Sequence, residues 1–204
     1  MSRRKPYHHD NLREALLEEA VRLIGEAGPG ALTLREVARR AGVSHNAPYR
    51  HFRDRDDLLA AMAAQGYREL THAMVAAIKD KSDPVERLKH AGLGYVTFAL
   101  RRPEHFTVIF DAPLSKDSHP DSAVAAEQAF NTLKELVKNC QDAGRLPPVD
   151  SLQLALLAWT MVHGIAKLAI AGRLPFRSHK EILKFAEFVI EQSLPIRGQR
   201  DPAT

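Results

Sequence analysis

The sequence has 204 residues, of which 45% are hydrophobic and 26% charged, as is ordinary for a globular protein of one large or two small domains. Its net charge is +4, and all of this excess lies in residues 1–55, which hold eleven Lys or Arg and seven Asp or Glu. The other 18 basic and 18 acidic residues cancel, so a polyanionic partner is expected only for the N-terminal part. The single cysteine excludes an intrachain disulfide and fits a reducing compartment.

The chain opens with basic residues but without the apolar core of a secretory signal. Residues 1–11 are therefore expected to form a short flexible arm that adds phosphate or minor-groove contacts. The most apolar run, 152–170, is interrupted by Gln153, Thr160 and Lys167, which favours a buried helix over a membrane span. We expect a cytoplasmic protein without a membrane partner.

A first helix is expected after Asp10, a candidate N-cap, and the Gly-Pro-Gly sequence at 28–30 ends it. Its apolar residues recur at helical spacing: Leu12, Leu16, Ala20, Leu23, Ile24 and Ala27. This helix is expected to pack across the two helices that follow and to complete a three-helix domain.

The second and third helices are predicted by their caps. Thr33 and Glu36 have the spacing of a capping box, and Gly42 can take the left-handed conformation that ends a helix. Ser44 is a good N-cap for the next helix, which is expected to run to about Phe52. Two helices joined in this way form a helix-turn-helix, whose second helix lies in the major groove of DNA.

The third helix carries aromatic, amide and basic side chains within about one and a half turns: His45, Asn46, Tyr49, Arg50 and His51. Asn pairs with adenine edges and Arg with guanine edges or phosphate, while Tyr and His reach phosphates. Pro48 lacks the N–H that a helix interior needs and is expected in or just after the first turn. The plainer alternative is a basic, solvated helical hairpin. The coincidence of cap, glycine turn and aromatic-basic helix favours DNA binding.

From Asn11 to Leu59 the sequence resembles the DNA-binding domain of the tetracycline-repressor-like (TetR/AcrR) regulators. The resemblance rests on LTLREVARRAGVS, on YRHF at 49–52 and on RDRDDLL, which opens the next helix. It implies DNA contacts by eight residues: Arg35, Ser44, His45, Asn46, Tyr49, Arg50, His51 and Arg55. Arg55 resembles the family's phosphate-anchoring basic residue. Pro48 stands where many members carry a small or apolar residue, and we do not expect it to read a base.

The rest of the chain also reads as helical, and nothing reads as a strand. A long helix is expected from about Arg55 to Lys79 without a Gly-Pro hinge, so it should link two domains rigidly. Further helices are expected over 84–102, 103–110, 123–143, 151–171 and 179–194, with a loop at 112–122. The prediction is an all-α protein of about nine helices. Residues 1–54 form the helix-turn-helix domain and residues 55–204 a ligand-binding and dimerisation domain.

The last two helices carry more apolar surface than one monomer core can bury. In Ser151–Ala171, polar residues recur every seven positions and form one narrow seam. One arc of this helix consists of small residues: Ala155, Ala158, Val162, Ala166 and Ala169. We predict that this helix and His179–Leu194 form a homodimer interface, a four-helix bundle across a two-fold axis, with the small-residue arc inside it.

The segment AWTMVHGIAKL resembles the Trp-His-Gly signature of one C-terminal domain class of this family, and members of the family enclose a ligand cavity. Seven residues are predicted to line it: Tyr67, Met74, Tyr95, Phe98, Phe110, Trp159 and His163. Three of them, Tyr95, Trp159 and His163, combine an apolar body with a hydrogen-bonding tip. The alternative for each is a place in a plain core, and His163 is equally a candidate core histidine. Cys140 is expected to pack rather than react, and no metal or other cofactor is expected because no metal motif is present.

Three functions compete. The favoured one is a homodimeric transcriptional repressor that binds a palindromic operator in double-stranded DNA and is released by a small, largely apolar ligand. The second is an effector-independent or architectural DNA-binding protein that recruits another protein. The third is an enzyme, and none is expected because the sequence has no nucleophile elbow, phosphate loop or metal motif.

Overall fold

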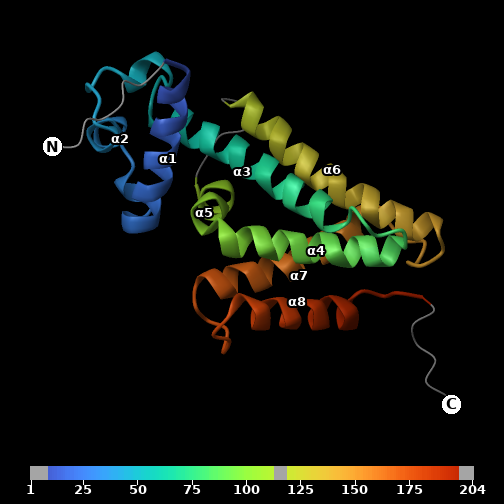
Figure 1. Cartoon of the computed structure of the whole chain (residues 1–204). Coiled ribbons are helices and arrows are strands. Elements are labelled where there is room, and N and C mark those ends of the chain that lie inside the picture. The colour runs from blue at the N-terminus through green and yellow to red at the C-terminus, as the bar shows by residue number, and fades with distance from the viewer. Residues whose placement is uncertain (1–8, 113–118, 198–204) are drawn as a thin grey trace. The chain divides into compact units, whose positions relative to one another are not determined.

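The structure is a computed structural model that describes residues 9–112 and 119–197. Within these residues it contains only helices, which confirms the predicted all-α fold (Figure 1). The eight α-helices are α1 (His9–Ala27), α2 (Leu34–Ala41), α3 (Arg55–Ala77), α4 (Pro84–Arg101), α5 (Pro103–Asp111), α6 (Pro120–Asp142), α7 (Ser151–Ile170) and α8 (His179–Ser193). Two short 3-10 helices are η1 (Pro29–Ala31) and η2 (Pro48–Arg50).

The helix starts follow from side chains that accept hydrogen bonds from otherwise unpaired backbone N–H groups. Thr33 accepts from Glu36 N in α2, and Asp150 accepts from Leu152 N in α7. At α8 the full capping box forms: Ser178 accepts from Glu181 N, and the Glu181 carboxylate accepts from Ser178 N. The predicted caps of these helices are therefore confirmed.

Two sequence-based boundaries were wrong. The helix after the 112–122 loop begins at Pro120, because proline at the first helical position needs no N–H partner. The first helix begins at His9, before its expected cap. Of the expected loop, residues 113–118 lie outside the described part of the chain.

The chain divides into two compact units, residues 1–66 with 104–123, and residues 67–103 with 124–204. Helix α3 contributes to both. The division after residue 54 that the sequence suggested concerns function, and it stays a proposal beside this division by packing.

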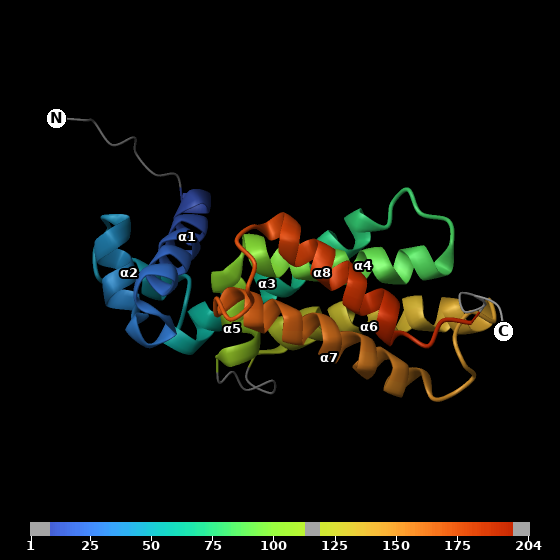
Figure 2. The same ribbon diagram turned by 90° about the horizontal axis from the view of Figure 1, so that it is seen from below.

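In the first unit α1 packs against α2 and η1. Both ribbon views show α1 beside α2 (Figures 1 and 2). Arg40 of α2 donates to Glu26 of α1 at 2.7 Å. Helix α5 belongs to this unit because it comes very close to two other helices. A Cβ added to Gly25 would lie 3.0 Å from Glu104, and one on Gly66 would lie 3.0 Å from Ile109.

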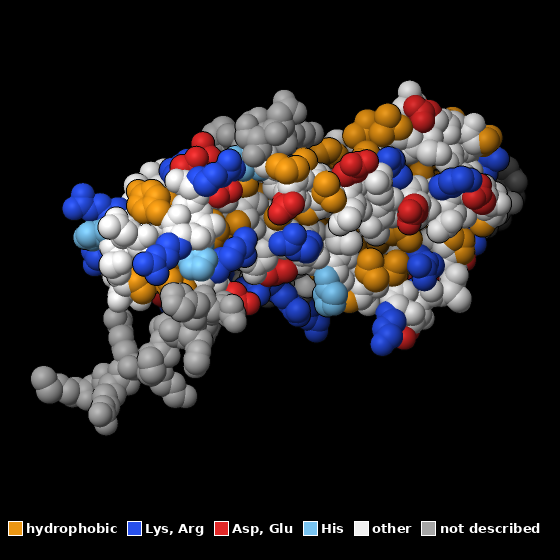
Figure 3. Space-filling view, turned by 90° about the horizontal axis from the view of Figure 1, so that it is seen from above, with side chains coloured by type: hydrophobic (Ala, Val, Ile, Leu, Met, Phe, Trp, Pro, Cys, Tyr) orange, Lys and Arg blue, Asp and Glu red, His pale blue; other side chains and the backbone are white. Residues whose placement is uncertain are grey.

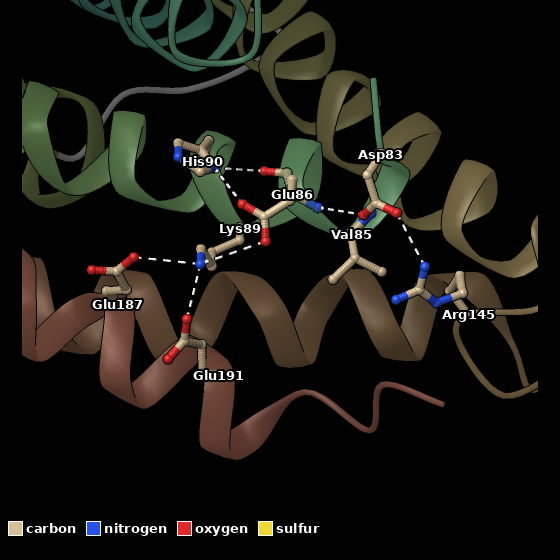
Figure 4. A network of polar contacts seen from close by, with 8 residues as sticks. All are labelled: Asp83, Val85, Glu86, Lys89, His90, Arg145, Glu187 and Glu191. Atoms are coloured by element: carbon tan, nitrogen blue, oxygen red, sulfur yellow. Dashed lines mark hydrogen bonds and ion pairs between the residues drawn. The ribbon is translucent and has the colours of Figure 1, made fainter. Parts of the chain in front are cut away.

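In the second unit α4 packs against both α7 and α8. Lys89 of α4 anchors α8: its ammonium lies 2.8 Å from Glu191 and 3.4 Å from Glu187, and 3.5 Å from Glu86 of its own helix (Figure 4). These carboxylates raise the pKa of Lys89. The two ion pairs with Glu187 and Glu191 therefore hold α4 against α8. At the start of α4, the Asp83 cap also pairs with Arg145 at 3.0 Å (Figure 4).

The small residues of α7 pack inside the protomer. Ala155, Ala158, Val162 and Ala166 are all buried, on the side of the helix opposite Thr160, and Ala169 of the same arc is half-buried. The expectation that this arc forms the dimer interface was wrong, because small side chains let helices of one chain approach closely. Helix α7 is also the one helix within the described residues long and apolar enough to cross a membrane. Length and composition alone are weak evidence for a span, because the core helix of a soluble protein passes the same test.

Candidate DNA interface and ligand cluster

The turn of the helix-turn-helix is built as the sequence predicted. Gly42 ends α2 with a φ of 68°, a conformation that glycine adopts without strain. Val43 N then donates back to Ala38 O at 3.0 Å. This reversal directs the chain into the segment Ser44–His51, which we call the recognition segment.

The recognition segment is not the regular α-helix that was predicted. A turn bond joins Ala47 N to Ser44 O at 3.0 Å, and η2 follows. Pro48 explains the difference, because it has no N–H to donate to Ser44 O. Its ring is buried, and its carbonyl accepts from both His51 N and Phe52 N at 2.9 Å. Proline therefore shapes the segment from within, which agrees with the expectation that it reads no base.

Most of the residues proposed to touch DNA are exposed in the first unit: Arg35, Ser44, His45, Asn46, Tyr49 and Arg50. Tyr49 is 58% exposed although its side chain is large and aromatic. His51 differs, because its Nε2 is buried and has no hydrogen-bond partner within the described residues. Any DNA contact by His51 would have to use Nδ1. On the face drawn in Figure 3, Lys, Arg and His side chains gather at the end formed by α1 and α2.

Two arginines of α2 are paired within the protein. Glu36 accepts from Arg39 at 2.6 and 2.8 Å and from Arg40 at 3.1 Å. Hydrogen bonds from Arg39 and Arg40 lower the pKa of Glu36 to about 2. This carboxylate orients both guanidinium groups and offsets part of the positive charge that the sequence places here.

Arg55 has partners that the sequence did not suggest. Its Nε donates to Leu32 O at 3.0 Å and its Nη2 to Pro29 O at 2.9 Å. Nη1 lies 3.2 Å from the Asp56 carboxylate. Backbone carbonyls leave no signature in a sequence, so these contacts could not have been predicted.

Three predicted ligand residues meet in the second unit. The Tyr95 hydroxyl lies 2.8 Å from His163 Nδ1 and accepts from Trp159 Nε1 at 3.2 Å. The Phe130 ring lies 5.8 Å from the Trp159 ring, and the Lys134 ammonium lies 5.7 Å from the Phe130 ring. We call these five residues the aromatic cluster. Burial raises the pKa of Tyr95, so its hydroxyl stays protonated.

The other predicted ligand residues are spread more widely. Met74 and Phe98 are buried in the second unit, and Tyr67 there is half-buried with its pKa raised by burial. Phe110 belongs to the first unit, where its ring lies 4.7 Å from Phe106. Phe130 was not among the seven predicted ligand residues, although its ring lies against that of Trp159.

Cys140 is fully buried, and its thiol donates to Pro84 O at 3.1 Å. Burial raises the pKa of this thiol to about 11, so it is protonated at neutral pH. Within residues 9–112 and 119–197, no three His, Cys, Asp or Glu side chains form a group that could hold a metal ion.

Two segments of the chain match models of known protein families. Residues 16–62 match the family model of bacterial regulatory proteins of the tetR family. Residues 88–192 match the model of the tetracyclin repressor-like C-terminal domain. Over the full chain and 99% of the relative, the sequence is 22% identical to the HTH-type transcriptional regulator AcrR of Shigella flexneri.

Solved structures with the same fold cover nearly the whole chain. A protein of unknown function from Rhodococcus sp. RHA1 is 34% identical, with a TM-score of 0.80, over 94% of this chain and 99% of its own. AibR, solved with isovaleryl coenzyme A and operator DNA, is 22% identical, with a TM-score of 0.71, over 90% of this chain and 98% of its own. The chain belongs to the TetR family of transcriptional regulators, with a helix-turn-helix domain and a tetracyclin repressor-like C-terminal domain.

Proposed function

We propose that this regulator is a homodimeric repressor that binds a palindromic operator and is released by a small, largely apolar ligand. The observation that carries the proposal is the row of exposed polar and aromatic side chains on the recognition segment. Tyr49 is the clearest case, because its large aromatic side chain is left 58% exposed beside exposed polar and basic neighbours. Such a repressor would act in the bacterial cytoplasm, where its operator lies.

The proposal gives each exposed side chain of this row a contact to a base edge or to a phosphate. Asn46 would pair with an adenine edge, and Arg50 with a guanine edge or a phosphate. Tyr49, His45 and Ser44 would bind phosphates and fix the register, together with Arg35 of α2. His51 would contribute through Nδ1.

For the dimer we propose the exposed face of α7 together with α8. Four leucines of α7 and one phenylalanine of α8 are 40–58% exposed: Leu152, Leu156, Leu157, Leu168 and Phe188. The leucines flank Thr160, on the side of α7 opposite its buried small residues. Exposed apolar side chains gathered on one helix face are typical of an interaction surface. A two-fold axis through this face would form a four-helix bundle.

For the ligand we propose a site in the second unit bordered by Tyr95, Trp159 and His163, with Tyr67, Met74 and Phe98 as further candidates. The aromatic surfaces favour an apolar ligand, and the hydrogen-bonding tips would orient one polar group of it. AibR supports an effector in principle, because it was solved with both isovaleryl coenzyme A and operator DNA. Its identity to this chain is too low to transfer that ligand.

Helix α3 offers a route for coupling, because it runs unbroken from Arg55 to Ala77 and contributes to both compact units. A ligand that displaces its C-terminal half, near Leu70 and Met74, would move the recognition segment. The two segments of the dimer would then fit successive major grooves less well. Such coupling is typically about 1–3 kcal/mol and reciprocal, so operator DNA would weaken ligand binding by the same factor.

The test begins with enrichment and sequencing of genomic fragments that the full chain retains, which yields an operator. Ligand affinity is then measured by calorimetry with and without operator, for compounds that lower operator occupancy. Weaker ligand binding in the presence of operator supports the repressor. Equal affinity in both titrations contradicts ligand release and favours an effector-independent DNA-binding protein. Retention of no fragment contradicts DNA recognition itself.

A further inference from the structure

Arg55 is the first residue of α3, yet its guanidinium reaches the connection between α1 and α2. Nε donates to Leu32 O at 3.0 Å and Nη2 donates to Pro29 O at 2.9 Å. These two carbonyls lie at the start and just after the end of η1. The partners are 26 and 23 residues away in sequence, so the contact fixes tertiary structure.

The carbonyls that Arg55 holds lie next to the start of the helix-turn-helix. Leu32 is fully buried and immediately precedes Thr33, the N-cap of α2. Pro29 O also accepts from Leu32 N at 3.3 Å, so the guanidinium and the 3-10 turn share an acceptor. Arg55 therefore joins the first turn of α3 to the residue from which α2 begins.

The same contacts occupy the N–H groups of Arg55 that a DNA phosphate would use. Nε and Nη2 form the edge of the guanidinium that matches a phosphate with two parallel hydrogen bonds. Both atoms donate to protein carbonyls, and Nη1 faces Asp56. A phosphate bound through that edge would have to replace two hydrogen bonds that hold the domain together.

We propose that Arg55 is a positioning residue, which sets the orientation of α2 and the recognition segment against α3, and not a phosphate contact. The proposal rests on the proposed DNA-binding function. The planar guanidinium is needed because one side chain must reach two carbonyls in fixed directions. A lysine keeps the charge but offers no such fork.

Arg55→Lys separates the two roles. With a positioning role, operator affinity falls about tenfold or more, the factor that loss of a charged hydrogen bond produces. Affinity for random DNA and its salt dependence stay at the wild-type value, because the charge is retained. With a phosphate role, Arg55→Lys binds operator almost as the wild type does, and Arg55→Gln lowers the salt slope by about one. Arg53→Lys is the matched control, because Arg53 is exposed and its side chain pairs with Asp57 on the neighbouring turn.

A second measurement uses the unaltered chain and does not depend on whether a variant folds. The Arg55 Nε–H signal in nuclear magnetic resonance is expected to exchange slowly with water, and its shift is expected to persist when operator is added. Fast exchange, or a large shift on DNA binding, overturns the positioning role. So does wild-type operator affinity in folded Arg55→Lys. If the wild-type chain binds no operator, the proposed function fails and not this inference about Arg55.

Discussion

The Tyr95 hydroxyl of α4 lies 2.8 Å from Nδ1 of His163 and accepts from Trp159 Nε1 at 3.2 Å, so one hydroxyl joins two side chains of α7 to α4. Trp159 Nε1 can only donate, so the hydroxyl oxygen is its acceptor. The three side chains are thereby held together in the second unit.

Tyr95→Phe is expected to lower the free energy of unfolding by about 1–3 kcal/mol, because Trp159 and His163 lose a shared partner in a buried setting. Denaturant unfolding of the full chain measures this. Tyr49→Phe removes the same atom from an exposed ring and is expected to change stability by less than about 0.5 kcal/mol. Equal effects of the two substitutions would show that the hydrogen bonds of the Tyr95 hydroxyl do not stabilise the second unit.

Gly94→Ala is expected to destabilise the second unit because α4 crosses the backbone of α3 at this residue. An added Cβ would lie 2.6 Å from Ala73 O and 3.0 Å from Met74 Cα, and backbone cannot turn aside. Overpacking of this kind costs about 1–3 kcal/mol. At Gly92, two residues away, the Cβ would meet only side-chain ends of Ile190 and Val162. Thermal unfolding should show a smaller loss for Gly92→Ala, and the reverse order would contradict this packing.

Leu157→Glu is expected to split the dimer, because a charge buried without a partner is costly and Leu157 lies on the exposed face of α7. Light scattering should give a monomer mass with helix content unchanged, and operator affinity should fall with it. Val124→Glu places the same charge at an exposed position of α6 and should leave the dimer intact. A dimer mass for Leu157→Glu would exclude this face of α7. Ala158 and Ala166 cannot test the interface, because they are buried within the protomer.

Glu36 gives the first unit a specific acid sensitivity. Arg39 and Arg40 lower its pKa from 4.5 to about 2, so the ionised form favours folding. Its contribution is complete above about pH 4.5 and is lost as the pH falls to about 2. Glu36→Gln should therefore be less stable than wild type at neutral pH, and the difference should shrink across that window. Glu14→Gln, at an exposed position of α1, is the control; a constant difference for Glu36→Gln would contradict the pairing.

The sequence predicted the helices well because their caps are local. Asp83, Asp150 and the pair Ser178 and Glu181 each act on an N–H within three residues, so spacing alone identifies them. The regularity of the recognition segment was overestimated, because one missing N–H at Pro48 outweighs the propensity of its neighbours.

Side-chain partners were predicted less well than helices. Helical periodicity assigned the small residues of α7 to one face, but it could not say whether that face packs inside the protomer or against a second copy. The aromatic cluster was partly found, because Tyr95, Trp159 and His163 have chemistry suited to a site. Arg55 was assigned by resemblance alone, and its carbonyl partners 23 and 26 residues away depend on the tertiary fold.

The central claim is that the recognition segment reads DNA, and operator titrations of Asn46→Ala and Tyr49→Ala at fixed salt test it most directly. Each substitution is expected to cost about 1–3 kcal/mol of operator affinity, since one base or phosphate contact is lost. Val124→Ala changes an exposed residue of α6 in the second unit, so this variant should bind the operator as the wild type does. If the folded double variant of Asn46 and Tyr49 keeps wild-type operator affinity, the recognition segment is not the DNA-reading element and the account is wrong.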